Sequence, residues 1–262
     1  MKFNKIIPFT LAIVVLAACE KVISVDLNSA APQLVIEGEV TNAAGPYQVK
    51  LSKTVNFSSS NVFPPVSGAM VQITDTGGAT DVLTETSPGI YSTHTLLGKP
   101  GKTYSLSVTA EGKQYSAVST MPAPVNLDSI TFEKTSFFNN KRTYAVVNFQ
   151  DPVGLGNYYR FTEYINGVVV PAAFVIEDRL SDGKYVSRTL FSDTANLVNG
   201  DNLSIRMNCI DESNYSYFRT YRIVTSNDNR SASPANPNSN ISNGALGYFS
   251  AHTVQTKQVT VH

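Results

Sequence analysis

The stretch "GKTYSLSVTAEGKQYSAVST" (residues 101–120) predicts two neighbouring strands joined by a tight turn. Tyr104, Leu106 and Val108 alternate with serine and threonine, so an extended chain has one apolar face and one polar face. The segment "EGK" supplies a glycine where the chain must reverse. This pattern is typical of an antiparallel hairpin that packs one side on a core and turns the other to water.

The same alternation extends upstream to residue 34. In "YQVKLS" (residues 47–52), Tyr47, Val49 and Leu51 share one face, and "LVIEGEV", "AMVQITD", "DVLTET" and "GIYSTHT" predict further strands. Short strands separated by Gly- and Pro-containing turns, with no helical pattern, indicate a β-sandwich over residues 32–122. This series also resembles the prealbumin-like modules of bacterial surface proteins, which implies an Ig-like or prealbumin-like scaffold. Such a fold does not by itself imply catalysis.

A domain boundary is predicted at "MPAPVNLDSI" (residues 121–130), where two prolines interrupt the alternation. The strands expected after it are longer: "LDSITFEK", "TYAVVNFQD", "NYYRFTEYING", "VVVPAAFVI", "KYVSRTLFSD", "DNLSIRMNCID" and a last one within "ALGYFSAHTVQTKQVTV". They predict a second antiparallel β-sandwich or barrel-like domain over residues 123–262. The chain is therefore expected to be mostly β.

One stretch of the second domain, "DESNYSYFRTYRIVTS" (residues 211–226), breaks the alternation. Ser213 or Asp211 has the side chain of a helix N-cap. Apolar residues then recur at three- to four-residue spacing: Tyr217 or Phe218, Tyr221 and Val224. A single short helix is predicted near residues 212–224, packed over the sheet.

The N-terminus has the pattern of a targeting segment. Lys2 and Lys5 accompany an apolar run over residues 6–16. That run is shorter than the roughly 20 residues needed to span a bilayer, but it fits the apolar region of a secretory signal. "LAAC" (residues 16–19) resembles the bacterial lipobox, which implies cleavage before Cys19 and acylation of its sulfur and new amino group. Residues 1–18 are thus predicted to be a lipoprotein signal peptide and residues 19–31 a lipidated tether; an ordinary cleaved signal is the alternative.

Lipidation of Cys19 changes the interpretation of the second cysteine. Two or three acyl chains anchor a protein stably, since each buried methylene contributes about 0.8 kcal/mol. If the Cys19 sulfur is acylated, Cys209 has no disulfide partner in the chain. Cys209 is therefore predicted to be a small buried hydrophobe. A metal site is not expected, because the three histidines, His94, His252 and His262, have no ligand spacing with it.

The charge of the chain argues against a nucleic-acid partner. The full sequence has 20 basic and 20 acidic residues, and removal of residues 1–18 leaves 18 basic residues against 20 acidic ones. Nucleic-acid binding requires a stripe or cluster of basic residues. The lysines and arginines of this sequence form neither. No nucleic-acid role is expected.

No catalytic, cofactor-binding or metal-binding set is predicted from the motifs. A "GxSxG" nucleophile elbow is absent from the sequence. His94 lies in the alternating stretch "YSTHT" and is expected at a strand surface, whereas His252 is expected to pack or form hydrogen bonds. The acidic residues fall at turns, where Asp forms local backbone hydrogen bonds, and "DTGGATD" and "SNDNR" lack EF-hand spacing. An unrecognised hydrolase remains an alternative.

The aromatic residues suggest a partner surface. The chain has 13 Tyr, 13 Phe and no Trp. Tyr and Arg are enriched where protein interfaces derive most of their binding energy, and the sequences "NYSYFRTYR" and "GNYYRF" combine such residues. The aromatic pair in "NISNGALGYFSAH" is a further candidate. The candidate partner surface comprises Tyr215, Tyr217, Phe218, Tyr221, Tyr248 and Phe249. The alternative is that these side chains belong to the core and its rim.

The order of several motifs resembles a known family. "LVIEGEVTN", "FPPVSGAMVQITD", "GKTYSLSVTAEGKQYSAVSTMP", "NYYRF" and "NPNSNISNGALGYFSAH", which follow Cys19, are similar to the Bacteroidota domain-of-unknown-function family DUF4249. The resemblance implies an outer-membrane lipoprotein, often encoded beside TonB-dependent receptors and without established activity. The expected function is a non-catalytic binding or accessory module, with such a receptor as partner and the membrane bound through Cys19.

Two questions stay open at this stage. A structural or adhesive envelope protein, in which tandem sandwiches act as a spacer, is the alternative to a binding module. Only Glu20 is acidic directly after Cys19, so the sequence leaves open whether the protein faces the periplasm or the cell surface.

Overall fold

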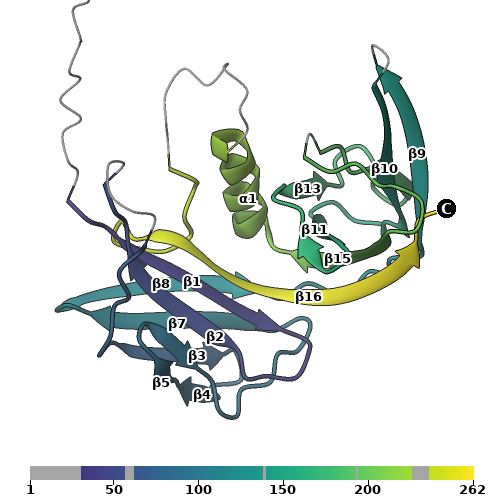
Figure 1. Cartoon of the computed structure of the whole chain (residues 1–262). Helices are drawn as coiled ribbons and strands as arrows, with labels where there is room; N and C mark the ends of the chain where they lie inside the picture. Colours follow the sequence, from purple (N-terminus) through teal and green to yellow (C-terminus); the bar gives the residue numbers. More distant parts are fainter. Residues whose placement is uncertain (1–30, 57–61, 138–139, 193, 226–235) are drawn as a thin grey trace, which may run out of the picture. The chain divides into compact units, whose positions relative to one another are not determined.

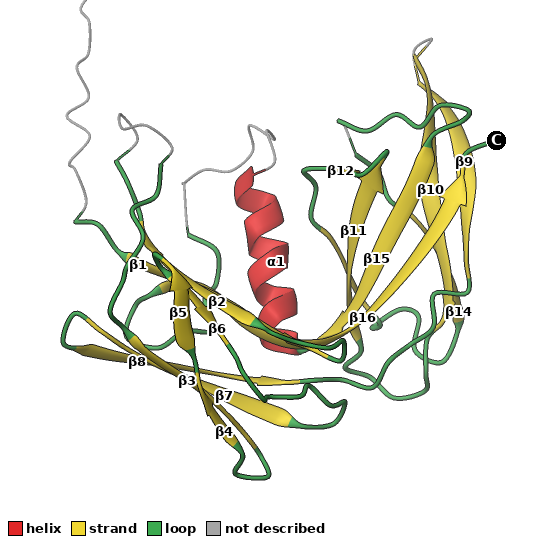
Figure 2. Ribbon diagram, turned by 60° about the horizontal axis from the view of Figure 1, so that its bottom comes forward, coloured by secondary structure: helices red, strands yellow, loops and turns green. Residues whose placement is uncertain are grey.

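The computed structural model describes residues 31–262 apart from residues 57–61, 138–139, 193 and 226–235. Residues Pro32–His262 form one compact unit. This unit is mostly β structure with one helix among the described residues (Figures 1 and 2), and nearly all strand pairs are antiparallel, which confirms the predicted fold class. The predicted signal peptide and almost all of the predicted tether lie outside the described residues.

The first half of the unit is built from eight short strands. They are β1 (Leu34–Thr41), β2 (Gln48–Lys53), β3 (Met70–Asp75), β4 (Thr80–Val82), β5 (Thr84–Ser87), β6 (Ile90–Ser92), β7 (Thr103–Ala110) and β8 (Lys113–Thr120). Strands β4, β3, β7 and β8 form one sheet, and β1, β2, β6 and β5 are consecutive in another. Tyr104, Leu106 and Val108 of β7 are buried, as the alternation predicts, and the apolar faces of both sheets contribute to one hydrophobic core.

The second half has longer strands and the helix. Its elements are β9 (Ser129–Phe137), β10 (Asn140–Gln150), β11 (Tyr158–Ile165), β12 (Val168–Val169), β13 (Phe174–Glu177), β14 (Tyr185–Thr189), β15 (Asn202–Ile210), α1 (Glu212–Thr225) and β16 (Leu246–Thr260). The helix confirms the prediction for residues 212–224. The stretch "VVVPAAFVI" is not one strand, because β12 ends before Pro171, which has no N–H for a ladder hydrogen bond.

The last strand, β16, belongs to both halves (Figure 1). Its first part pairs with β1 in parallel, from Val35 opposite Leu246 to Thr41 opposite His252, and its second part pairs with β15 in antiparallel fashion. The close approach to β1 needs a glycine: Gly247 has φ +94°, and a Cβ there would lie 2.0 Å from the Ile36 carbonyl oxygen. A side chain at this position would push the two strands apart.

The described residues form two large hydrophobic clusters, one in each half of the unit. The first combines strands β1–β8 with residues of the C-terminal stretch, including the fully buried Phe249 and Ala251. The second lies within strands β9–β16 and contains Cys209, which is 4% exposed and unbridged, as predicted. No helix in the described part of the chain combines the length and apolar character that a membrane crossing requires.

Candidate functional site

Helix α1 begins after Asp211, whose side chain caps it. The Oδ1 atom of Asp211 accepts a hydrogen bond from the backbone N–H of Asn214 at 3.0 Å, the contact of an N-cap residue. Its Oδ2 atom accepts hydrogen bonds from the Ser119 hydroxyl (2.6 Å) and the Thr120 N–H (3.1 Å) of β8. One carboxylate therefore both starts the helix and attaches it to the first half of the unit.

The buried face of α1 packs on β16 through three aromatic rings. Tyr217 and Phe218 are buried, and their ring centroids lie 5.0 Å and 4.9 Å from that of Tyr248 on β16. Tyr217 and Phe218 are themselves 5.1 Å apart at an angle of 85°. These separations lie in the range in which aromatic pairs attract each other beyond simple burial, so the cluster fixes the position of the helix on the sheet.

A hollow of about 500 Å³ lies beside this cluster, and we call it the aromatic hollow. It lies between α1, the outer face of β11, Tyr248 of β16, Glu37 of β1 and the segment of residues 169–173. Its lining comprises Glu37, Arg160, Thr162, residues 169–173, Tyr217, Phe218, Tyr221, Thr225 and Tyr248. Figure 1 shows how α1 stands beside β13 and β11, with β16 passing below it.

Arg160 of β11 provides the positive charge of the aromatic hollow. The guanidinium carbon lies 3.9 Å from the centre of the Phe218 ring, which is a cation–π contact. Its Nη1 atom is 4.0 Å from Glu39 Oε1, and the same oxygen accepts a hydrogen bond from the Tyr248 hydroxyl at 2.9 Å. A guanidinium has five N–H donors, so the hollow combines a donor-rich cation with an aromatic wall.

Two tyrosines of the aromatic hollow, Tyr217 and Tyr248, are held in the neutral form. Burial raises the pKa of Tyr217 to about 12, with a further contribution from the charge of Glu37. Burial also raises the pKa of Tyr248 well above its usual range, and the charge of Glu39 adds to the effect. The hollow therefore presents phenolic O–H groups and one guanidinium, which suit a ligand with carbonyl or carboxylate oxygens and an apolar part.

The two histidines singled out from the sequence lie away from this lining. His252 is 2% exposed, and its Nδ1 atom is 3.0 Å from the Ser250 hydroxyl, in agreement with the predicted packing and hydrogen-bonding role. Burial lowers the pKa of His252, against the effect of nearby Glu39. His94 lies just after β6 rather than in a strand, with a half-exposed side chain whose Nδ1 is 3.1 Å from Asp81 Oδ1.

The predicted partner surface is partly assembled. Tyr217, Phe218, Tyr221 and Tyr248 line the aromatic hollow together. Tyr215 is not among the lining residues, and its ring stacks on that of Tyr158 with a centroid distance of 4.9 Å. The prediction that Phe249 belongs to the partner surface is wrong, because its side chain is fully buried in the first hydrophobic core. Neighbouring residues of a strand face opposite sides, so Phe249 and Tyr248 point in opposite directions. Cys19, the predicted lipidation site, lies outside the described residues.

Glu37 and Glu39 were not predicted as site residues, and Arg160 was predicted only as part of the "GNYYRF" patch. They lie on β11 and β1, more than a hundred residues apart in the sequence, and each occupies an ordinary polar position of an alternating strand. The only available indication was the "NYYRF" motif, which contains Arg160. The alternation in β11 predicts that the Arg160 side chain points away from the hydrophobic core. It does not predict that the guanidinium contacts the Phe218 ring.

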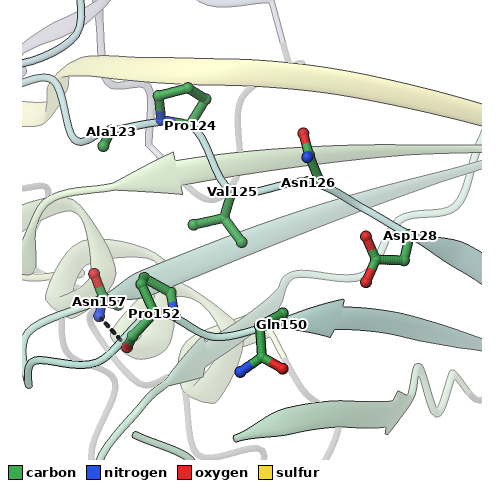
Figure 3. Close-up of a pocket in the computed structure, with 8 residues that line it drawn as sticks. All are labelled: Ala123, Pro124, Val125, Asn126, Asp128, Gln150, Pro152 and Asn157. Atoms are coloured by element: carbon green, nitrogen blue, oxygen red, sulfur yellow. Dashed lines mark hydrogen bonds between the residues drawn. The ribbon is translucent and has the colours of Figure 1, made fainter. Parts of the chain in front are cut away.

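A second hollow, of about 320 Å³, lies near the connection between the two halves (Figure 3). Residues 123–128 lie along one side, and Gln150, Pro152 and Asn157 form the other. The Asn157 Nδ2 atom donates a hydrogen bond to the Pro152 carbonyl at 3.5 Å. Asp128 is the single charged side chain in this described lining. This hollow therefore offers little chemistry for a charged ligand.

Three acidic side chains from two separate segments of the sequence come together near Pro152. Asp151 follows β10, and Asp178 and Asp182 lie in the turn after β13. One carboxylate oxygen from each lies within 4.8 Å of the others, and Asp151 and Asp178 are buried. The sequence placed Asp178 only at a turn, and its spacing from Asp151 indicated no common site. Hard cations prefer oxygen ligands of this kind.

The comparisons with known proteins give a family but no activity. A family model described as "Domain of unknown function (DUF4249)" matches residues 20–258, which is most of the chain. No curated protein matches the sequence.

Proposed function

The chain belongs to the DUF4249 family, a domain of unknown function, and on that premise we propose that it is a non-catalytic binding module of the outer membrane. In this proposal the chain is anchored through Cys19 and binds a segment of a TonB-dependent receptor in the aromatic hollow. The lipobox-like "LAAC" supports lipid anchoring through Cys19. The frequent encoding of DUF4249 proteins beside TonB-dependent receptors supports such a receptor as the partner.

The observation that carries the proposal is the composition of the aromatic hollow. Tyr217 and Phe218 supply a rigid aromatic wall, and Arg160 supplies a charge that lies on that wall. Tyr and Arg are the residue types that most often dominate the binding energy of protein interfaces. The lining contains no histidine or cysteine among its described residues, which favours binding over nucleophilic catalysis.

The rim of the aromatic hollow also favours a protein segment over a small enclosed ligand. Tyr221 at the helix and Val169 at the opposite side are 42% and 51% exposed. Exposed apolar side chains that surround a hollow are typical of surfaces covered by a partner. A receptor segment with carbonyl or carboxylate oxygens matches the donors of Arg160 and the hydroxyls of Tyr217 and Tyr221, since the Tyr248 hydroxyl already donates to Glu39.

The proposal is tested by affinity capture from detergent-solubilised outer membranes, with a tag after His262. We expect the full chain to retain a TonB-dependent receptor, identified by mass spectrometry, and Tyr221→Ser to reduce its recovery at least tenfold. Tyr185→Ser is the matched control, because Tyr185 is an exposed tyrosine (56%) on β14 and does not line the hollow. Equal receptor recovery with both variants contradicts the proposed site, and no receptor with the unsubstituted chain favours the spacer function.

Membrane attachment needs a separate measurement. Cys19→Ser is expected to abolish labelling with palmitate and to release the protein into the soluble fraction, because the acylated sulfur is lost. A Cys19→Ser chain that still carries label contradicts the lipoprotein assignment. This experiment does not depend on the receptor, so the anchor and the binding site are tested independently.

A further inference from the structure

The cluster of Asp151, Asp178 and Asp182 contains a buried oxygen that no other group satisfies. Asp151 is fully buried. Its Oδ1 atom accepts a hydrogen bond from the Tyr159 hydroxyl, whereas its Oδ2 atom has no hydrogen-bond partner. A buried carboxylate oxygen without a partner costs free energy unless something else compensates it.

The other two carboxylates are held in place by backbone N–H groups of the loop between β10 and β11. Gly154 donates to Asp182 Oδ1 at 2.7 Å. Gly156 donates to Asp178 Oδ1 at 3.2 Å, while Asp178 Oδ2 accepts two hydrogen bonds from Asn157. A carboxylate oxygen has two lone pairs, so the single N–H bond to each Oδ1 atom leaves that oxygen able to accept a second partner. The loop therefore orients the carboxylates without neutralising their charge.

No basic side chain neutralises this cluster in the described part of the chain. None of the ion pairs found there includes Asp151, Asp178 or Asp182. Lys184, in the same turn, donates instead to the Leu180 carbonyl oxygen at 3.4 Å. Burial raises the pKa of Asp151, and the charges of Asp178 and Asp182 raise it further, against the hydrogen bond from Tyr159 and a contact from the Gly183 N–H that does not reach hydrogen-bond geometry.

The spacing of the three carboxylates fits a shared cation. Ca²⁺ binds oxygen at about 2.3–2.6 Å, so two oxygens on one ion are at most about 5 Å apart. The oxygens of the cluster lie within 4.8 Å of one another. Mg²⁺ requires bonds of about 2.0–2.1 Å in a near-ideal octahedron and retains several waters, which suits this buried cluster less well.

We propose that Asp151, Asp178 and Asp182 bind a calcium ion that joins the loop after β10 to the turn after β13. The ion would face the free Oδ2 atom of Asp151, and water or carbonyl oxygens would complete six to eight ligands. It would compensate the charge that the protein itself leaves unbalanced. Calcium would thereby stabilise the second half of the unit.

The first test titrates CaCl₂ into the chelator-treated full chain by calorimetry and follows thermal unfolding. We expect a Kd of about 10⁻⁴–10⁻³ M, the range of extracellular calcium modules, and a rise in Tm that MgCl₂ does not reproduce. Asp182→Asn should weaken calcium binding at least tenfold. This variant should fold, because Asp182 is only partly buried.

Asp128→Asn is the matched control, because Asp128 is an exposed acid near the same loop that lies outside the cluster. It should bind calcium within twofold of the unsubstituted chain. Three outcomes overturn the proposal: no heat and no rise in Tm with CaCl₂, equal stabilisation by MgCl₂, or unchanged affinity in Asp182→Asn.

A spectroscopic test locates the ion independently of stability. Terbium replaces calcium at oxygen sites and emits when a nearby aromatic residue transfers excitation to it. The chain has no Trp, so this excitation passes through tyrosine, and the Tyr159 hydroxyl is bonded to Asp151. We expect calcium-displaceable emission that Asp182→Asn reduces at least tenfold and Tyr159→Phe dims. Emission that is unaffected by Asp182→Asn overturns the assignment.

Discussion

Asp75 and Asp81 in the first half and Asp151 and Glu163 in the second half are all buried carboxylates, yet their surroundings differ. Asp75 pairs with Lys102 and accepts two backbone N–H bonds. Asp81 accepts backbone N–H bonds from three consecutive residues. Asp151 and Glu163 each keep an oxygen with no hydrogen-bond partner.

The difference extends beyond the carboxylates. Among the described residues, buried side-chain nitrogen or oxygen atoms that lack a hydrogen-bond partner occur only after residue 150. They belong to Asp151, Glu163, Asn208, Asn214 and Thr253. Native proteins satisfy most buried polar groups, and exceptions often mark functional positions. Within the described residues, the first half thus satisfies its buried polar side chains, whereas the second half leaves several of them without a partner.

The largest effect is expected from breaking a satisfied carboxylate. Asp81→Ala leaves the N–H groups of His94, Thr95 and Leu96, bound at 2.9, 2.7 and 2.8 Å, without their acceptor. We expect the free energy of unfolding to fall by about 4 kcal/mol, measured by urea denaturation. His94→Ala is the control and should cost less than about 1 kcal/mol, since its side chain is half exposed.

The same carboxylate predicts an acid-sensitive first half. Burial of Asp81 opposes its ionisation, but the hydrogen bonds from Thr95, His94 and Leu96 outweigh burial and lower its pKa to about 2. Its contribution to stability is therefore present above pH 4 and is lost as the pH falls from about 4 towards 2. An Asp81→Ala chain whose loss of stability is equally large at pH 2 and pH 7 contradicts this assignment.

An unsatisfied carboxylate should behave in the opposite way. Burial raises the pKa of Glu163 to about 7. The folded state therefore favours the protonated form, and stability falls as the pH rises from about 4.5 to 7. We expect Glu163→Gln to stabilise the protein by about 3 kcal/mol at pH 8 and to change little at pH 4, since each pKa unit corresponds to about 1.36 kcal/mol.

Urea denaturation at both pH values measures the Glu163 effect. Glu133→Gln is a suitable control, because Glu133 is an exposed strand glutamate in the same half. A Glu163→Gln chain that is destabilised at pH 8 would show that the carboxylate has a partner that the described contacts do not include.

The smallest effect is expected at Cys209, which lies opposite Thr253 in the β15–β16 pair. Burial raises the pKa of the Cys209 thiol, so the group is neutral and acts as an apolar side chain. Cys209→Ala should lower the free energy of unfolding by about 1 kcal/mol and leave membrane attachment unchanged. A loss of more than about 3 kcal/mol, or a soluble protein, contradicts this role.

Local patterns account for most of the elements. Alternation predicted the strands around Tyr104 and Tyr47, the aromatic spacing after Asp211 predicted α1, and the isolation of Cys209 predicted a buried thiol. The alternation gave a wrong prediction where a single residue interrupts a strand, and where it did not show which face of a strand a side chain occupies. Pro171 ends a stretch that was expected to be one strand, and Phe249 enters a core instead of a surface.

By itself the sequence determined the β-rich fold class, the helix, the lipobox-like cysteine and the family resemblance, because each depends on residues close together in the chain. Only the tertiary structure decided that β16 pairs with both β1 and β15, that Arg160 lies on Phe218, and that Asp151 meets Asp178 and Asp182. These contacts join residues from about 27 to more than 200 positions apart. Periodicity shows which face a side chain occupies, but the partner on that face is selected by how distant strands pair and pack.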